Sequence, residues 1–140
     1  MFDVTTGLQS VGTGFFPFLI YLVLGLALTG GFVALYASVT PHAELALVKE
    51  DRAGAAISLG GAMIGFAVPM AAIIAQAVTI FDFLFWGVVA GLAQLAAFWV
   101  FRLVFPKISG RIEGGEVAAP TVLAATHVVI GFINAASLVY

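Results

Sequence analysis

A short polar stretch at residues 39–54 holds the side chains of this chain that are best suited to acid–base or metal chemistry. It reads VTPHAELALVKEDRAG, although only 9% of the whole chain is Asp, Glu, Lys or Arg. Imidazole and carboxylate groups transfer protons and bind metals. His42 and Glu44 are two residues apart, however, and this spacing does not place them on one face of a helix. The sequence therefore predicts no metal site here.

His127 is the one ionisable side chain at depth in an apolar run. It could relay protons, because imidazole titrates near neutral pH and ionisable residues inside membranes are often functional. The alternative is a neutral His127 that is hydrogen-bonded to a neighbour such as Gln94. No Asp or Glu lies in the middle of a run, which argues against a proton or cation transporter. We define the polar seam as Thr29, Gln94, His127 and Asn134.

Signatures of known enzymes and of nucleic-acid-binding proteins are missing from the sequence. The chain has no HExxH, no Gly-x-Ser-x-Gly and no phosphate-binding loop. It has no cysteine, and its net charge of −2 gives no sign of a basic surface for nucleic acid. We therefore expect that the protein is not an enzyme and that it binds no cofactor, metal or nucleic acid.

The composition requires lipid as the solvent for most of the chain. Hydrophobic residues make up 63% of the 140 residues, and the mean hydropathy is +1.19, whereas soluble domains are roughly 45–50% apolar. Each apolar run exceeds the roughly 20 residues that cross a bilayer as an α-helix. The chain is therefore expected to be an all-α membrane protein with four transmembrane helices, at 14–38, 54–78, 83–105 and 117–140.

All Lys and Arg residues lie in or beside two of the connections, at 39–53 and 106–116. Cytoplasmic loops are enriched in Lys and Arg, so we expect both connections in the cytoplasm of a bacterium and both termini in the periplasm. The glycines and charges of 106–116 are typical of a solvated turn. The predicted organisation is a periplasmic tail at 1–13, a first transmembrane hairpin at 14–78 and a second at 83–140.

The loop at 39–53 contains more polar residues than orientation in the membrane requires. Lys49 and Arg52 are sufficient to fix that orientation. Thr40 and Pro41 favour the first positions of a helix, so we expect a short interfacial helix to begin there. Two interpretations, a cytoplasmic docking surface or only a helix cap, remain open for Thr40, Pro41, His42 and Glu44.

The two predicted hairpins resemble each other in sequence. Residues 39–67 read VTPHAELALVKEDRAGAAISLGGAMIGFA, and residues 104–133 read VFPKISGRIEGGEVAAPTVLAATHVVIGFI. Pro41 matches Pro106, and both segments end with the sequence IGF and one further residue. Because each repeat contains two helices, both have the same orientation in the membrane, and their pseudo-symmetry axis runs along the membrane normal. The expected fold is therefore two parallel-repeat helical hairpins.

Small residues recur at helical spacing within the runs. Such ridges let helix backbones approach closely in membranes. We expect the ridges to face one another, for packing within the chain and for assembly. On the second run the spacing i, i+4, i+7 and i+11 is followed by Gly54, Ser58, Gly61 and Gly65. The corresponding residues are Gly87 and Gly91 on the third run and Gly131 on the fourth.

Several segments resemble one known family, namely TPHAELALVK, DFLFWG at 82–87 and GFINAA at 131–136. From about residue 15 onward, the chain is similar to the YjfL-like family of small bacterial inner-membrane proteins, a domain of unknown function. The resemblance implies a duplicated two-helix hairpin, a setting similar to that of envelope-stress components, and no activity. His127 departs from the family pattern, which has a small residue there, so no family-wide proton relay is implied. The pattern marks Thr40, Pro41, His42, Glu44, Lys49, Gly61, Gly65, Pro69, Asp82, Trp86, Gln94, Arg102 and Asn134.

Taken together, these features favour a multi-pass inner-membrane protein without enzymatic activity. We expect it to assemble in the lipid bilayer with copies of itself or with a membrane-protein partner, as an accessory or structural subunit linked to envelope organisation or stress. The alternative is a small homo-oligomeric channel or transporter that uses the polar seam.

Overall fold

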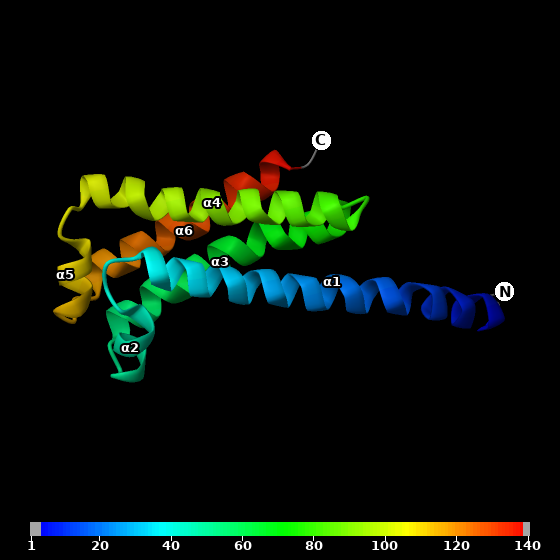
Figure 1. The fold of residues 1–140 in the computed structure, drawn as a ribbon, viewed down its shortest axis with the longest axis horizontal. Coiled ribbons are helices and arrows are strands. Elements are labelled where there is room, and N and C mark those ends of the chain that lie inside the picture. The colour runs from blue at the N-terminus through cyan, green and yellow to red at the C-terminus, as the bar shows by residue number, and fades with distance from the viewer. Residues whose placement is uncertain (1–3, 139–140) are drawn as a thin grey trace.

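A computed structural model describes residues 4–138, and within this range it contains helices and no strand (Figure 1). It contains four long helices and two short ones, and the short helices lie in the longer connections. In chain order the elements are α1 (Val4–Val39), α2 (Glu44–Lys49), α3 (Ala53–Gln76), α4 (Ile80–Val104), α5 (Ile108–Glu113) and α6 (Ala118–Ser137).

The four long helices are long and apolar enough to cross a membrane. With 24, 25 and 20 residues, α3, α4 and α6 are about 30–38 Å long at about 1.5 Å per residue, which matches a bilayer core of about 30 Å. The predicted all-α membrane fold with four transmembrane helices is thereby confirmed. The short helices α2 and α5 lie together at one end of the bundle, and the described chain begins and ends toward the other end (Figure 1).

The order long, short, long occurs twice along the chain, in α1 to α3 and in α4 to α6. In each half, the turn after the short helix contains a residue with a left-handed backbone, namely Asp51 with φ 58° and Gly115 with φ 84°. Glycine adopts this conformation freely, and aspartate tolerates it better than most residues. Both halves therefore reverse direction by the same local means, whereas the internal repeat itself stays a prediction.

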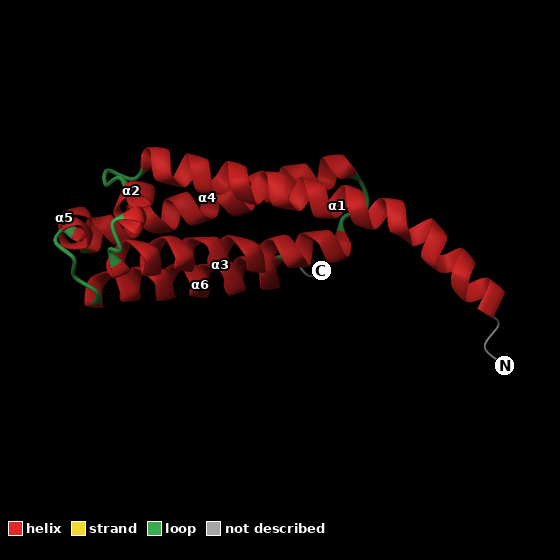
Figure 2. Cartoon of the chain, turned by 90° about the horizontal axis from the view of Figure 1, so that it is seen from below, coloured by secondary structure: helices red, strands yellow, loops and turns green. Residues whose placement is uncertain are grey.

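The core lies mainly between the two halves of the chain. Figure 2 shows two layers, with α1 and α4 in one and α3 and α6 in the other. α3 packs most extensively against α6, and its contacts with α1, its partner in the predicted first hairpin, are fewer. Ala55, Ala62 and Phe66 on α3 are at most 1% exposed. α3 is therefore the central helix of the bundle.

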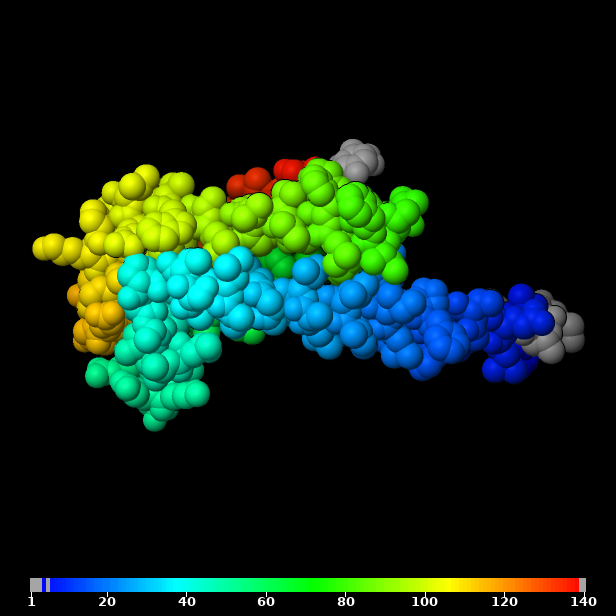
Figure 3. All heavy atoms as spheres, in the orientation of Figure 1, coloured from blue at the N-terminus to red at the C-terminus, as the bar shows by residue number. Residues whose placement is uncertain are grey.

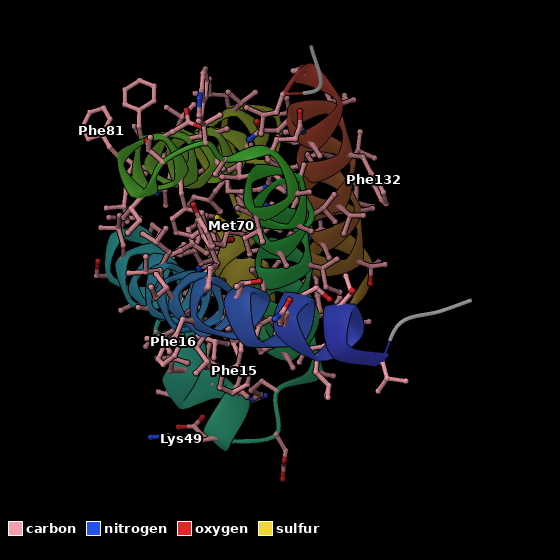
Figure 4. The ribbon with its side chains drawn as sticks, turned by 90° about the vertical axis from the view of Figure 1, so that its right-hand side faces the viewer. Phe15, Phe16, Lys49, Met70, Phe81 and Phe132 are labelled. Carbon is pink, nitrogen blue, oxygen red and sulfur yellow. The ribbon has the colours of Figure 1, made fainter. Side chains whose placement is uncertain are left out.

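The outer surface of the bundle is apolar, as a surface in contact with lipid must be. Phe81 and Phe132 point outward and are 78% and 61% exposed, whereas Met70 points into the bundle and is 4% exposed (Figure 4). Since lipid favours apolar residues on the outside as well as in the core, the informative residues of this protein are the buried polar ones.

α1 is longer than the apolar run that predicts it. The helix begins at Val4, so residues 4–13, which were expected to form a tail, are helical. The apolar run shows only which part of a helix lies in lipid, and it does not show where the helix begins. Its 36 residues are about 54 Å long. The N-terminal part extends past the other helices and bends away from them (Figure 1 and Figure 2). Pro17 lies within α1, and an internal proline removes a helical hydrogen bond and favours such a bend.

The connection between α4 and α6 differs from its expected form. The sequence predicts a solvated turn at 106–116, but this segment contains α5, in which Ile108 and Ile112 are fully buried. Their i, i+4 spacing places both on one face of the short helix, which packs against α6 and α3. Six residues are too few for a helix that is stable alone, so tertiary packing holds α5 in place.

The first connection contains the expected short helix, but α2 begins later than predicted. Thr40 and Pro41 precede it, and the helix starts at Glu44 with Ala43 at the N-cap position. The Thr40 N–H donates to the carbonyl oxygen of Tyr36 at 3.0 Å, so Thr40 ends α1 and does not cap α2. The Thr40 hydroxyl is buried and has no hydrogen-bond partner among the described residues.

The orientation in the membrane can be measured with single cysteines, because the chain has none of its own. Gly110 lies on α5, and Val78 lies at the opposite end of the bundle and is 87% exposed. Since Lys and Arg concentrate at the α2 and α5 end, we predict that a membrane-impermeant maleimide labels Val78→Cys in intact cells and labels Gly110→Cys only after lysis. The reverse pattern would show that the orientation is inverted.

Candidate functional site

Four polar side chains meet at the end of the bundle that carries α2 and α5. Glu44 Oε1 accepts hydrogen bonds from His42 Nε2 at 2.8 Å and from the Ser58 hydroxyl at 3.2 Å. His42 Nδ1 lies 3.2 Å from the Ser109 hydroxyl oxygen. His42 and Glu44 belong to the first connection and its helix α2, Ser58 to α3 and Ser109 to α5. The cluster therefore ties the two halves of the chain together.

A tight turn of the backbone brings His42 and Glu44 together. Ala43 between them has φ −77° and ψ 72°, and the Glu44 N–H donates to the His42 carbonyl oxygen at 2.9 Å. These values are those of an inverse γ-turn. The spacing argument assumes that both residues are helical, and it is wrong here because His42 precedes the helix. Among the residues that the structure describes, no three His, Asp or Glu side chains are grouped so that they could hold a metal ion.

Burial removes three of the four predicted docking residues from the surface of this loop. Thr40, His42 and Glu44 are 6%, 1% and 0% exposed, so a partner protein cannot reach them. A histidine and a carboxylate that bond each other can be buried at lower cost than either alone, which is why polar loop residues point inward here. The exposed residues of the loop include Pro41, Lys49 and Arg52.

A second polar cluster lies deeper, where the four long helices meet. His127 Nδ1 on α6 lies 2.7 Å from Gln94 Oε1 on α4, and His127 Nε2 lies 3.1 Å from the Tyr36 hydroxyl oxygen on α1. Gln94 Nε2 donates to the carbonyl oxygen of Gly65 on α3 at 2.8 Å and to that of His127 at 3.2 Å. The three residues that contribute side chains are each 0% exposed, namely Tyr36, Gln94 and His127. Each long helix thus contributes at least one group to this cluster.

The partners of Gln94 determine which nitrogen of His127 carries a proton. Two carbonyl oxygens accept from the Gln94 amide nitrogen, so the amide oxygen must face His127 Nδ1. An oxygen acceptor at this position requires a proton on Nδ1. The other nitrogen of a neutral imidazole is then an acceptor. The Tyr36 hydroxyl therefore donates its proton to His127 Nε2.

Tyr36 connects the two clusters. Its hydroxyl contacts His127, and it interacts electrostatically with Ser58 and Glu44 of the first cluster. Its ring packs edge-on against Phe98, with ring centroids 5.8 Å apart, and this packing keeps the hydroxyl in place. We call the connected residues the polar chain, which consists of Ser109, His42, Glu44, Ser58, Tyr36, His127 and Gln94.

The polar chain ends at an apolar layer in the middle of the bundle. Phe66 on α3 stacks on Phe32 of α1, with ring centroids 4.5 Å apart and an interplanar angle of 11°. Met70 and Ile73 follow along α3, each 4% exposed. Among the described residues, the buried polar ones are Thr40 and members of the polar chain. The fully buried polar side chains therefore run from the α2 and α5 end to the middle of the bundle, and farther along α6 the structure buries the amide nitrogen of Asn134.

A close contact between α3 and α6 sets the position of His127. A Cβ atom at Gly65 would overlap the backbone of His127, and one at Gly131 would overlap the backbone of Gly65. At Gly61, a Cβ would overlap Ala124. Only glycine allows the two backbones to come this close. The predicted small-residue ridge of α3 is buried along this helix, at Gly54, Ser58, Gly61 and Gly65.

The glycines of α4 face large side chains of α1 and α3. A Cβ at Gly87 would lie 2.7 Å from Leu28, and one at Gly91 would lie 3.6 Å from Phe32 and Phe66. The expectation that the small-residue ridges face one another is therefore wrong for α4, because α1 offers leucine and phenylalanine at this level. A cleft of about 200 Å³ lies beside these glycines, between α1 and α4.

The structure brings Gln94 and His127 of the polar seam together but places Thr29 and Asn134 elsewhere. The Thr29 hydroxyl donates to the carbonyl oxygen of Gly25 in its own helix at 2.8 Å. Asn134 Nδ2 is buried and has no hydrogen-bond partner among the described residues. The polar seam is thus no continuous path, and its two central members belong to the polar chain instead.

Two members of the polar chain, Tyr36 and Ser109, are missing from the residues predicted from sequence. Tyr36 carries a signal that could have revealed it, because Gly25, Thr29 and Tyr36 follow the spacing i, i+4 and i+11 on one helical ridge. Ser109 carries no such signal. It reaches His42 only because α5 forms and packs under the bundle, which the local sequence does not predict.

Comparison with known proteins identifies the family. A family model described as Domain of Unknown Function (DUF350) matches residues 9–138. The chain belongs to the DUF350 family. This membership confirms the resemblance in sequence to YjfL-like proteins, and the matched segment of the DUF350 chain includes every residue of the polar chain.

Two curated relatives of this DUF350 chain are both described as UPF0719 inner membrane protein YjfL, one from Escherichia coli strain K12 and one from Escherichia coli O157:H7. Each is 30% identical over 120 residues, which cover 86% of this chain and 91% of the relative. No solved structure matches the chain. The relatives and the four apolar helices together identify a multi-pass inner-membrane protein.

The contact between α3 and α6 gives a stability prediction with a neighbouring control. A Cβ at Gly61 would overlap Ala124, whereas one at Gly60 meets nothing within 4 Å. We predict that Gly61→Ala lowers the free energy of unfolding by about 1–3 kcal/mol through overpacking, and that Gly60→Ala leaves it unchanged or raises it by about 0.5–1 kcal/mol. Thermal denaturation in detergent, followed by circular dichroism, measures both. Equal midpoints for the two variants would contradict the contact.

Proposed function

We propose that the protein is a non-enzymatic inner-membrane subunit that assembles with further copies of itself through α1, in an accessory role in envelope organisation or stress. The observation that carries the proposal is the exposure of α1. This helix has the smallest buried share of the four long helices, and its N-terminal part extends beyond the bundle without another helix of the described chain beside it (Figure 3).

The cleft next to α1 favours a protein neighbour over lipid alone. Apolar exposure in a membrane does not by itself require a partner, because lipid tails cover it equally well. The cleft between α1 and α4, however, is lined by Gly31, Gly87 and Gly91, which leave backbone accessible. Small residues of this kind are enriched where transmembrane helices approach each other closely. A second copy of the chain can supply the apolar helix that fits there.

The length of α1 gives a further reason for a neighbour. A helix of about 54 Å exceeds the bilayer core of about 30 Å and must tilt, bend or extend into the interface. The tilt of such a helix is set by packing against neighbouring helices. Within one copy, few contacts hold α1 to the other long helices, so assembly would supply this packing.

The geometry of the polar chain supports a role without catalysis. Ser109, His42 and Glu44 are connected in series, as are the serine, histidine and acid of serine hydrolases. Here the carboxylate contacts Nε2 and the serine contacts Nδ1, which is the reverse of the hydrolase arrangement. His42 and Glu44 are also at most 1% exposed, which leaves a substrate no route to the base.

A small channel or transporter is the second candidate, and the polar chain is the observation that favours it. Ionisable side chains inside membrane proteins commonly mark ion or proton pathways. In this conformation, however, the polar chain stops at the stacked rings of Phe32 and Phe66. Transport across the bilayer would require this layer to move, whereas assembly through α1 requires no such change.

The mass of the protein in mild detergent and in lipid nanodiscs tests the assembly. Gly31 lines the cleft, and its neighbour Gly30 does not, while a Cβ at either position meets nothing within 4 Å. We predict that the wild-type protein has a multiple of the 14.5 kDa chain mass. Gly31→Phe should shift it to the monomer, because the ring fills the cleft, and Gly30→Phe should leave the assembly intact.

A wild-type monomer in both environments would contradict the proposed assembly, as would a Gly31→Phe variant that assembles like Gly30→Phe. Ion flux through proteoliposomes of the wild-type protein would support the channel candidate instead. The helix content of both phenylalanine variants, measured by circular dichroism, controls for misfolding.

A further inference from the structure

We propose that the polar chain is a one-sided proton path, which carries a proton from the α2 and α5 end of the bundle to His127 in its middle. This activity goes beyond the proposed assembly and does not depend on it. A network that only held helices together could consist of hydroxyls and amides. Here, imidazole, carboxylate and phenol groups, each able to exchange a proton, stand in series at His42, Glu44, Tyr36 and His127.

Hydrogen bonds join the groups from Ser109 to Ser58 and from Tyr36 to His127. Ser109 is partly exposed and lies 3.2 Å from His42 Nδ1, so it is the contact of the path with its surroundings. Glu44 Oε1 lies 2.8 Å from His42 Nε2 and 3.2 Å from the Ser58 hydroxyl, so one oxygen contacts both neighbours. The path continues from Ser58 to the Tyr36 hydroxyl, with which Ser58 interacts electrostatically. That hydroxyl lies 3.1 Å from His127 Nε2.

Each transfer along the path leaves the number of protons unchanged. A proton that arrives at His42 Nδ1 releases the proton of Nε2 to Glu44 Oε1. The Ser58 hydroxyl, which otherwise donates to Glu44, turns toward Tyr36, accepts this proton from Glu44 on its oxygen and gives its own proton to the Tyr36 oxygen. Tyr36 then donates its original proton to His127 Nε2, which is free to accept because Nδ1 already carries one. One proton enters, and one is held on an imidazolium at His127.

Glu44 is suited to an intermediate position in this path. Its Oε2 is buried and has no hydrogen-bond partner among the described residues, although buried carboxylate oxygens are normally bonded. Uptake of a proton neutralises the carboxylate and so lowers the cost of this unpaired oxygen. The groups that face Glu44 are the imidazole of His42, the phenol of Tyr36 and the neutral hydroxyl of Ser58 on α3.

The surroundings of His127 explain why the path ends there. Tyr36 is the titratable group that faces it from α1, and α4 and α3 present the neutral Gln94 side chain and the Gly65 backbone. The Gln94 oxygen accepts from Nδ1 and can stabilise the imidazolium, but an amide does not readily pass a proton on. The stacked ring of Phe66 follows on α3. The path is therefore open toward one side of the membrane only.

Exchange of the His127 ring proton with water measures access to the site. The full-length protein is labelled with ¹⁵N-histidine in nanodiscs, and His127→Gln assigns the signal. Tyr36→Phe removes the connecting hydroxyl but keeps the ring that packs on Phe98. We predict that it slows exchange at His127 by about tenfold or more, since a positioned proton-transfer group is worth at least that. Glu44→Gln breaks the path at a second point and should slow exchange similarly.

Tyr21→Phe is the matched control, because the Tyr21 ring packs edge-on against Phe83, with centroids 5.4 Å apart, outside the polar chain. It should leave exchange unchanged. A purely structural Tyr36 predicts the opposite sign, since loss of its hydrogen bond would loosen the bundle around His127 and speed exchange. Exchange in Tyr36→Phe that equals or exceeds the wild-type rate would overturn the proposal. Wild-type exchange as slow as that of Glu44→Gln would overturn it as well.

Discussion

The close approach of α3 and α6 is the constraint on which the rest of the structure depends. Gly61, Gly65 and Gly131 let the two backbones touch, and this contact places the carbonyl oxygens of Gly65 and His127 side by side. Gln94 can therefore donate to both from α4. The position of the Gln94 amide in turn sets the protonated nitrogen of His127 and the direction of the Tyr36 hydroxyl. A glycine contact thus determines the chemistry of the site.

Hydrogen bonds select this arrangement of helices in a solvent that does not distinguish core from surface. Lipid tails are as apolar as leucine, so helix association in membranes depends on close packing and on polar contacts. Each such hydrogen bond contributes only about 0.6–2 kcal/mol, but an unpaired polar group in hydrocarbon costs several kcal/mol. Tyr36, Gln94 and His127 satisfy one another only when α1, α4 and α6 surround α3. The cluster therefore favours one packing of the four helices over its alternatives.

One end of the bundle is filled by apolar side chains and the other also holds buried polar ones, and the local sequence does not predict the burial of the polar ones. Apolar residues such as Ile73 and Phe83 fill the end away from α2 and α5, as hydropathy predicts. At the other end, Glu44 and His42 are buried although both lie in a charged loop. A loop residue in sequence is normally a surface residue, and the exception arises because α5 folds under the bundle and supplies Ser109 to His42.

The sequence by itself determined the number and kind of the transmembrane helices, because continuous apolar runs of bilayer length leave few other structures. It also determined that the ridge from Gly54 to Gly65 packs against protein, since small residues at helical spacing have that use in membranes. Only the tertiary structure decided the site. His127 is far from Tyr36 and Glu44 in the chain, and the spacing of Tyr36 and Glu44 does not predict that they interact. Their connection depends on an inverse γ-turn at Ala43 and on the depth at which α3 crosses α6. Neither is encoded in local periodicity, because both result from the way the four helices pack together.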